Sequence, residues 1–302
     1  MPPTPPPPAA GRFVIPVAIV VLCLIWGSTW WAIRVCLHDQ PPLSSAAVRF
    51  LVAGAAMAVA TPLLRSLDRL PAPPAWLWLV TGATSFAGSY GVLYIAEQHV
   101  PSGVAAVLWG VFPLLMAGSG VLVLGERLHG AQWLGFLVSF AGIATVFAGD
   151  LGSGGDAPAP IGAALLLLAS PVVSAVGTTL VKKFGRDRSS LQLNRNGMLF
   201  GGVLLALAAL WREDPLAMAW STQGLLATGY LALCGTALTF GVYFWLLQQV
   251  PASRLSLISY VTPVLAVLLG ALVGDGTTGT AVWLGTALVV AGVALVVRRP
   301  KP

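Results

Sequence analysis

Short polar breaks divide this sequence into a series of long apolar stretches, and those stretches limit the fold more than any other feature. A helix needs about 20 consecutive apolar residues to cross the hydrocarbon layer of a membrane. Only 9% of the residues are charged, against about 25% in a typical soluble domain, so water is not the expected solvent. The sequence therefore predicts an all-α membrane protein with ten transmembrane helices, at roughly 14–36, 44–64, 76–96, 102–124, 131–148, 161–181, 192–211, 223–247, 254–273 and 280–297.

The basic residues lie mostly on one side of this predicted bundle. An even number of spans places both termini on the same side, and Lys and Arg gather in cytoplasmic loops. The opposite set of loops holds only Arg212. This distribution predicts that both termini are cytoplasmic, and it explains the net charge of +6 without a nucleic-acid partner. The basic residues on the predicted cytoplasmic side are Arg12, Arg65, Arg69, Arg127, Lys182, Lys183, Arg186, Arg188, Arg254, Arg298, Arg299 and Lys301.

The second half of the chain repeats the first at an offset of 150 residues. Pro113 recurs as Pro263, and Trp133-Leu134-Gly135 recurs as Trp283-Leu284-Gly285. Each half holds five predicted spans, and an odd number inverts the second half in the membrane, as in many secondary transporters. The predicted organisation is a disordered cytoplasmic tail (1–12), a first five-helix repeat (13–149), an outer linker (150–160), a second, inverted repeat (161–298) and a cytoplasmic tail (299–302).

Several motifs resemble the drug/metabolite transporter superfamily. They are the Trp26–Trp30 stretch WGSTW, Arg49 early in the second span, and Pro113 followed by Gly125-Glu126. Within that superfamily, the chain is similar to the branch with two EamA repeats, and the resemblance covers about residues 14–297. It is similar in general character to aromatic amino-acid exporters of bacterial inner membranes. The resemblance implies a multi-pass carrier of the cell inner membrane.

The mid-span prolines suggest where a substrate binds. Proline has no N–H, so Pro113 and Pro263 leave the carbonyls of Trp109 and Ser259 without their helical partners. In lipid such a carbonyl must face protein, water or cargo. We expect both to line a central cavity and to accept hydrogen bonds from a substrate ammonium; in the alternative, each proline only bends its helix for packing. The candidate substrate-binding residues are Trp26, Tyr90, Tyr94, Trp109, Pro113, Tyr243, Ser259, Tyr260 and Pro263.

Other residues are expected to serve the scaffold. Arg34 and Arg49, near the outer ends of spans one and two, are expected to anchor at the membrane interface, although they could attract a carboxylate. Small residues allow close helix approach in lipid. The expected packing glycines are Gly135, Gly142, Gly197, Gly201, Gly285 and Gly292, and the expected aromatic belt is Trp30, Trp31, Trp76 and Trp78.

The function predicted from these features is secondary transport by alternating access. The sequence places no Asp or Glu in the middle of a span, which favours facilitated diffusion over tight proton coupling. A weakly polar, aromatic cavity suits small neutral or zwitterionic metabolites, and export of aromatic or hydrophobic amino acids from the cytoplasm is favoured. The alternatives are a carrier of drug-like amines or nucleotide-sugars, a membrane-embedded enzyme, and a structural subunit.

No cofactor, metal or catalytic group is predicted. The three cysteines lie in or beside apolar stretches, and the three histidines fall in short loops. The expected partners are a small-molecule substrate, an amino acid or a related metabolite, and the lipid bilayer. A monomer is compatible with this function.

Overall fold

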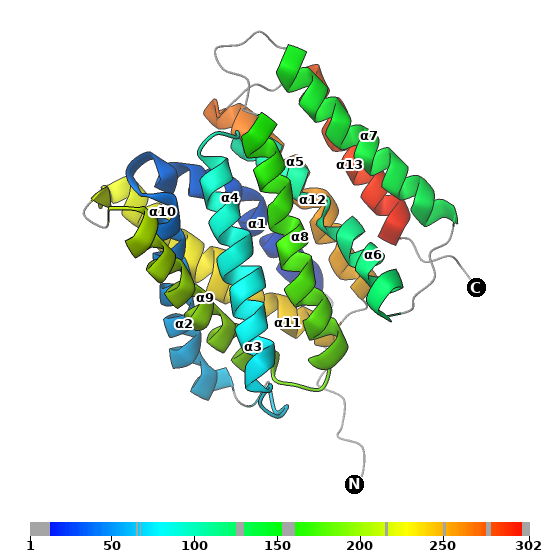
Figure 1. Ribbon diagram of the computed structural model, residues 1–302. Helices are drawn as coiled ribbons and strands as arrows, with labels where there is room; N and C mark the ends of the chain where they lie inside the picture. Colours follow the sequence, from blue (N-terminus) through cyan, green and yellow to red (C-terminus); the bar gives the residue numbers. More distant parts are fainter. Residues whose placement is uncertain are drawn as a thin grey trace.

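The chain folds into a single bundle of helices, shown in Figure 1 as a computed structural model. The structure describes residues 13–64, 66, 68–124, 130–152, 161–214, 217–249, 252–275 and 279–297, and these contain helices, turns and loops but no strand. The predicted tails, 1–12 and 299–302, lie outside the described residues. The helical elements are α1 (Val14–Asp39), α2 (Pro42–Leu64), α3 (Ala75–Thr81), η1 (Gly82–Gly88), α4 (Ser89–Glu97), α5 (Ser102–Trp109), α6 (Phe112–Leu124), α7 (Gly130–Gly152), α8 (Ile161–Phe184), α9 (Ser190–Arg212), α10 (Thr222–Ala232), η3 (Leu233–Leu238), α11 (Thr239–Gln249), α12 (Ala252–Val273) and α13 (Thr280–Val297).

Most of the predicted spans appear as long apolar helices. The described residues hold seven helical stretches that are long and apolar enough to cross a membrane, three of which combine consecutive elements such as α3, η1 and α4. Three shorter apolar helices accompany them, at Gly130–Val146, Val261–Val273 and Thr280–Leu295. The all-helical fold is confirmed, and the count of ten spans stays a prediction. Residues 150–152, which the sequence assigned to the outer linker, continue α7.

Two π-helical segments repeat at the offset seen in the sequence. The segment η1 (Gly82–Gly88) joins α3 to α4, and η3 (Leu233–Leu238) joins α10 to α11. A π turn holds one extra residue compared with an α turn, and such segments often lie at functional sites. Their recurrence 150 residues apart shows that the two halves share backbone irregularities as well as prolines and glycines.

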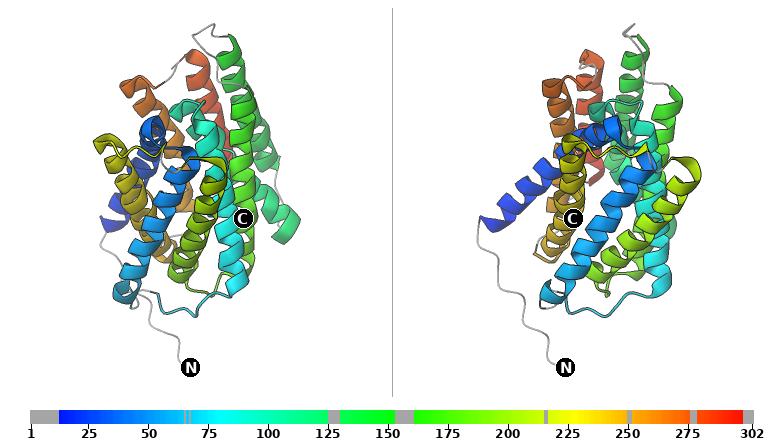
Figure 2. Two further views of the ribbon diagram at one scale, coloured as in Figure 1. Left: turned by 60° about the vertical axis from the view of Figure 1, so that its left-hand side comes forward. Right: turned by 90° about the vertical axis from the view of Figure 1, so that its left-hand side faces the viewer.

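Equivalent helices of the two halves pack against each other and run antiparallel. A Cβ added to Gly142 would lie 2.7 Å from the Gly285 carbonyl oxygen, and one on Gly292 would meet the backbone of Gly135. The earlier glycine of α7 contacts the later glycine of α13, and the later one of α7 contacts the earlier one of α13. The two helices are therefore antiparallel. Figures 1 and 2 show this pair together at one flank of the bundle.

The helices α2 and α9 form a second pair of the same kind. Gly54 meets Leu199, and Gly202 meets Leu51, so this pair is also antiparallel. Gly197 and Gly201 of α9 receive Phe86 of η1. The predicted packing role of these glycines is confirmed, because only residues without a side chain allow such contact.

The two mid-span prolines have different effects. The helix is interrupted at Gly110 and Val111, so Pro113 stands at the start of α6 after a break. By contrast, α12 continues through Pro263, which is buried. Identical residues at equivalent positions therefore interrupt one span and leave the other continuous.

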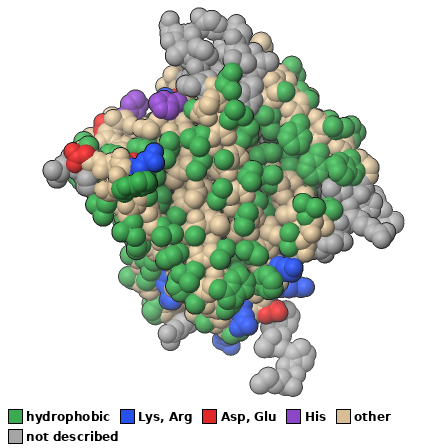
Figure 3. Space-filling model, in the orientation of Figure 1, with side chains coloured by type: hydrophobic (Ala, Val, Ile, Leu, Met, Phe, Trp, Pro, Cys, Tyr) green, Lys and Arg blue, Asp and Glu red, His purple; other side chains and the backbone are tan. Residues whose placement is uncertain are grey.

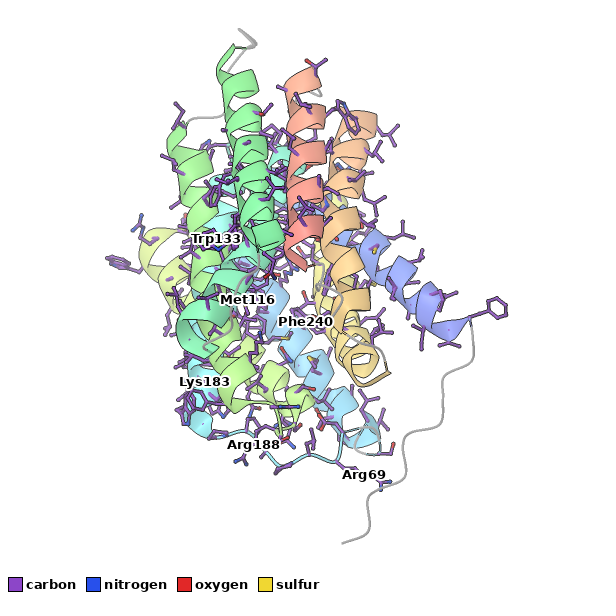
Figure 4. All side chains as sticks on the ribbon, turned by 90° about the vertical axis from the view of Figure 1, so that its right-hand side faces the viewer. Arg69, Met116, Trp133, Lys183, Arg188 and Phe240 are labelled. Carbon is purple, nitrogen blue, oxygen red and sulfur yellow. The ribbon has the colours of Figure 1, made fainter. Side chains whose placement is uncertain are left out.

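The outer wall of the bundle is apolar and its ends carry opposite kinds of charge. In Figure 3 hydrophobic side chains cover most of the visible face, and Lys and Arg gather towards its lower edge. Figure 4 shows Arg69, Lys183 and Arg188 together at this end. The other end holds several acids, among them Asp39, Glu213 and Asp275.

The close α7–α13 contact can be tested with Gly142→Ala. The added methyl group would lie 2.7 Å from a backbone oxygen, so we expect the variant to lose about 1–3 kcal/mol of unfolding free energy. The control is Gly229→Ala in α10, where nothing lies within 4 Å of the added Cβ; it should be neutral or about 0.5–1 kcal/mol more stable. Thermal unfolding in detergent measures both, and equal midpoints would contradict the described packing.

Candidate substrate site

The centre of the candidate site is a buried arginine. Arg49 of α2 is 2% exposed. Its Nε donates to the Thr236 hydroxyl of η3 at 2.9 Å, and its Nη1 donates to the Tyr94 hydroxyl of α4 at 3.3 Å. The guanidinium also faces the Tyr90 ring, 4.9 Å from its centroid. Two elements, α4 from the first half of the chain and η3 from the second, therefore hold this cation.

The position of Arg49 corrects the expectation that it anchors at the membrane interface. It lies about two turns, ~10 Å, into α2, where its side chain is enclosed by protein. No carboxylate of the described residues lies within ion-pair distance of it. A buried cation held only by hydroxyls and ring faces can still accept an anion. The feature of the sequence that could have predicted this role is the position of Arg49 inside a span, because charged residues inside spans usually serve function.

A continuous series of aromatic rings extends from Arg49 across the bundle. Tyr90 contacts Phe50, with ring centroids 4.8 Å apart, and Phe50 contacts Phe86 at 5.4 Å. Phe86 in turn contacts Phe240 at 6.0 Å. The series ends where Trp26 contacts Phe240 and Tyr243, with centroids 6.1 and 5.6 Å apart. Of the predicted residues, it includes Trp26, Tyr90 and Tyr243, and Tyr94 joins it through Arg49.

Trp109 belongs to a separate group at the break in the fourth span. Its ring stacks on Phe112 at 4.8 Å, and its indole N–H donates to the Ser170 hydroxyl at 3.1 Å. Trp30 lies 6.3 Å away and is 8% exposed, so its predicted place in an aromatic belt is wrong. Trp31 and Trp76, at 39% and 44% exposed, do face outward as expected.

The structure does not bring the remaining predicted substrate-binding residues together in one site. Pro113 is half-buried and Pro263 buried, and neither takes part in the ring series described above. The side chains of Ser259 and Tyr260 lie outside the described residues. Two cavities, of about 180 and 310 Å³, lie at the basic end of the bundle, and none of the predicted binding residues lines them. The central cavity thus stays a prediction.

Phe50, Phe86 and Thr236 are site residues that the sequence analysis missed. Phe86 and Thr236 occupy equivalent positions in η1 and η3, 150 residues apart. The extra residue of a π turn changes which side chains face the bundle centre, and an ideal α-helical periodicity cannot anticipate that change. Thr236 donates to the Leu231 carbonyl five residues back, at 2.8 Å, and so has its oxygen free to accept from Arg49.

A second charged side chain, the half-buried Arg34, lies at the acidic end of the bundle. Arg34 donates to the backbone carbonyls of Glu97 and Gln98 at 2.7 and 2.6 Å, and its Nε lies 3.4 Å from Asp275. Arg34 therefore joins α1 to the end of α4 and to the turn after α12. Its anchoring at the membrane interface stays a prediction. Gly274 makes this turn possible, because its φ of 71° lies in the left-handed region that favours glycine.

Glu97 is the buried acid that the sequence analysis did not expect. It is 0% exposed, and neither carboxyl oxygen has a hydrogen-bond partner among the described residues. Glu97 is the last residue of α4, so it agrees with the prediction that no acid lies in the middle of a span. The sequence analysis did not anticipate its burial.

Comparison with known proteins supports the repeat and the fold. The model of the EamA-like transporter family matches twice, over residues 14–148 and 161–298. The inner membrane transporter YedA of Escherichia coli is 34% identical over 283 residues, covering 92% of this chain and 89% of YedA. The transporter YvbV of Bacillus subtilis is 26% identical and covers 94% of this chain and 91% of its own length. One solved crystal structure, 24% identical, has a TM-score of 0.67 and covers 94% of this chain and 96% of its own.

The two family matches coincide with the two halves that the π segments and antiparallel helix pairs relate. The match also extends over nearly the whole chain at substantial identity. The chain is therefore a member of the EamA-like transporter family, within the drug/metabolite transporter superfamily.

Proposed function

We propose that this protein carries small zwitterionic metabolites across the cell inner membrane by alternating access, and that it exports aromatic or hydrophobic amino acids. Arg49 binds the substrate carboxylate, and the aromatic series from Tyr90 to Trp26 receives an apolar side chain. The carbonyls beside Pro113 and Pro263 are the sequence-based candidates to bind the ammonium group, although the structure does not bring them together with Arg49. Rocking of the two repeats exposes this site to each side in turn.

The observation that carries the proposal is the absence of an acidic partner for Arg49 among the described residues. A guanidinium binds a carboxylate through two parallel hydrogen bonds, and its planar donors suit that ligand well. In the structure, hydroxyl groups take two of its donors, and hydroxyls can rotate or yield to a charged ligand. The rings around it exclude water and so strengthen the attraction.

The same observation distinguishes the competing substrates. A lipophilic amine would place a second cation near Arg49, where no described carboxylate lies within ion-pair distance. The diphosphate of a nucleotide-sugar carries more negative charge than one arginine balances. Neither an enzyme nor a structural subunit would need an unneutralised cation at the centre of a duplicated bundle.

The role of Arg49 can be tested by the choice between phenylalanine and phenethylamine, which lacks the carboxylate. In proteoliposomes the wild type should prefer phenylalanine, because only phenylalanine can pair with the guanidinium. Arg49→Gln should lower that preference by roughly 10- to 100-fold, since a hydrogen bond to a charged group contributes about 1.5–3 kcal/mol. Competition by unlabelled compounds against labelled phenylalanine measures the ratio.

Two further variants control this experiment. Arg49→Lys keeps the charge but not the paired geometry and should fall between wild type and Arg49→Gln. Arg212→Gln removes an exposed arginine that lies over Trp211, far from the site in sequence and structure, and should leave the ratio unchanged. An unchanged ratio in a folded Arg49→Gln variant would contradict the proposal.

The transport mode is facilitated diffusion in this account, even though Glu97 is buried. Exchange of labelled phenylalanine should proceed at equal pH on both sides of the vesicle membrane, in the wild type and in Glu97→Gln. The matched control is Glu213→Gln, another acid of the same end, whose carboxylate accepts from Leu43 and Ser44. A strict requirement for a pH gradient, lost only in Glu97→Gln, would show instead that transport is proton-coupled through Glu97.

The proposed orientation can be tested by thiol labelling in a cysteine-free background. The native cysteines to be replaced are Cys23, Cys36 and Cys234. An impermeant maleimide applied to intact cells should label Asp214→Cys at the acidic end and should label Asp187→Cys at the basic end only after permeabilisation. The reverse pattern would place both termini outside.

A further inference from the structure

The larger of the two cavities lies among cations at the basic end of the bundle. Its volume is about 310 Å³, and its lining includes Lys183, Arg186 and Arg188. Phe184, Asp187 and Pro71 complete the lining. Figure 4 shows Lys183 and Arg188 at this end, below Phe240 of the aromatic series.

Local hydrogen bonds hold the cavity walls in place. The loop after α8 is fixed to the segment before α3, because the Ser189 N–H donates to the Pro71 carbonyl at 2.8 Å. Arg188 adds a contact to the Ala72 carbonyl at 3.4 Å. The Lys183 ammonium lies 5.5 Å from the centroid of the Phe184 ring. The exposed cations thus lie around an open surface hollow, on a loop that is held to the segment before α3.

Among the described residues, no ion pair neutralises these cations. In the described ranges, none of Lys183, Arg186 and Arg188 forms an ion pair, although Asp187 is their neighbour in sequence. Like charges at short range repel one another, and an anion placed between them removes that repulsion. The cavity is therefore suited to a phosphate group.

An aromatic pair borders the cavity on the outside of the bundle. Trp76 of α3 and Phe184 of α8 pack edge to face, with centroids 5.3 Å apart. They are 44% and 48% exposed. Exposed aromatic rings beside cations are typical of the membrane interface, where the rings meet the glycerol region and the cations meet headgroups.

The fold itself does not require cations at this junction. The repeat relates the contact between α8 and α3 to the contact between α1 and α10, and each of these contacts joins the two halves of the chain. At that equivalent junction Ser221 caps α10, donating to Asp39 and accepting from the Gly224 N–H. At the basic junction Ser189 likewise caps α9, donating to Asp68 and accepting from the Gln192 N–H. An acid and a hydroxyl therefore close both junctions, and the cations of the basic end are additional to this closure.

We propose that this basic cavity binds the phosphate of an anionic phospholipid, with Trp76 and Phe184 against the glycerol and upper acyl region. Basic pockets at the cytoplasmic side of a bundle are suited to such headgroups. The inference is independent of the transported substrate. Free phosphate shares the charge of the headgroup but cannot contact the aromatic pair, and this difference separates the two ligands.

The test uses full-length protein in zwitterionic nanodiscs containing a small fraction of phosphatidylglycerol. Native mass spectrometry counts the phosphatidylglycerol molecules that remain bound after release from the disc. The double variant Arg186→Gln/Arg188→Gln should bind this lipid roughly 30-fold more weakly, because each cation near the surface contributes about a factor of five. Trp76→Ala should also weaken lipid binding and leave any binding of inorganic phosphate unchanged.

The control is Arg212→Gln, which removes a cation that also lies beside an aromatic ring, over Trp211, but at the acidic end. It should retain phosphatidylglycerol as the wild type does. Equal retention in the folded double variant would overturn the proposal, and so would equal loss in Arg212→Gln, which would indicate general surface charge. Binding of inorganic phosphate that matches the lipid in affinity would show that the cavity takes a small anion instead.

Discussion

A charged group enclosed in an apolar bundle must find its partners within the protein, and Arg49 is where this constraint has most effect. Lipid supplies no hydrogen bonds, so the protein must hold the guanidinium with its own hydroxyls and ring faces. It does so with Tyr90 and Tyr94 from one half of the chain and Thr236 from the other. The cation therefore ties the two repeats together at the level where the substrate is proposed to bind.

The same constraint explains why the two halves pack their helices in the same way but place different side chains at the candidate site. The glycine contacts of α7 with α13 and of α2 with α9 are reciprocal, because backbone packing serves both halves alike. At the π segments the halves differ: Phe86 stands in η1 where Thr236 stands in η3. One half supplies an aromatic ring and the other a hydroxyl, so a symmetric scaffold gives an asymmetric site suited to a zwitterion with one apolar end.

The sequence could predict the features that depend on its internal repeat or on its apolar composition. The helical membrane fold follows from the length of the apolar stretches, and the packing of Gly142 and Gly292 follows from their spacing. The roles of Arg34, Trp30 and Glu97 could not be predicted, because each depends on a neighbour distant in sequence. Arg34 reaches Asp275 only after the turn at Gly274, and Trp30 is buried in a core where it contacts the distant Trp109. Pro113 and Pro263 show the same limit, since equivalent prolines break one helix and not the other.

The account depends on the carboxylate of the cargo meeting Arg49, and a direct distance measurement is its sharpest test. Solid-state NMR of the protein in lipid, with guanidinium nitrogens labelled and carboxyl-labelled phenylalanine bound, can measure this contact. The account predicts that the bound carboxylate lies within hydrogen-bonding distance of one arginine, about 3 Å between nitrogen and oxygen. In Arg49→Lys the contact between the carboxylate and a labelled guanidinium should be lost. Bound phenylalanine whose carboxylate lies far from Arg49 would contradict it.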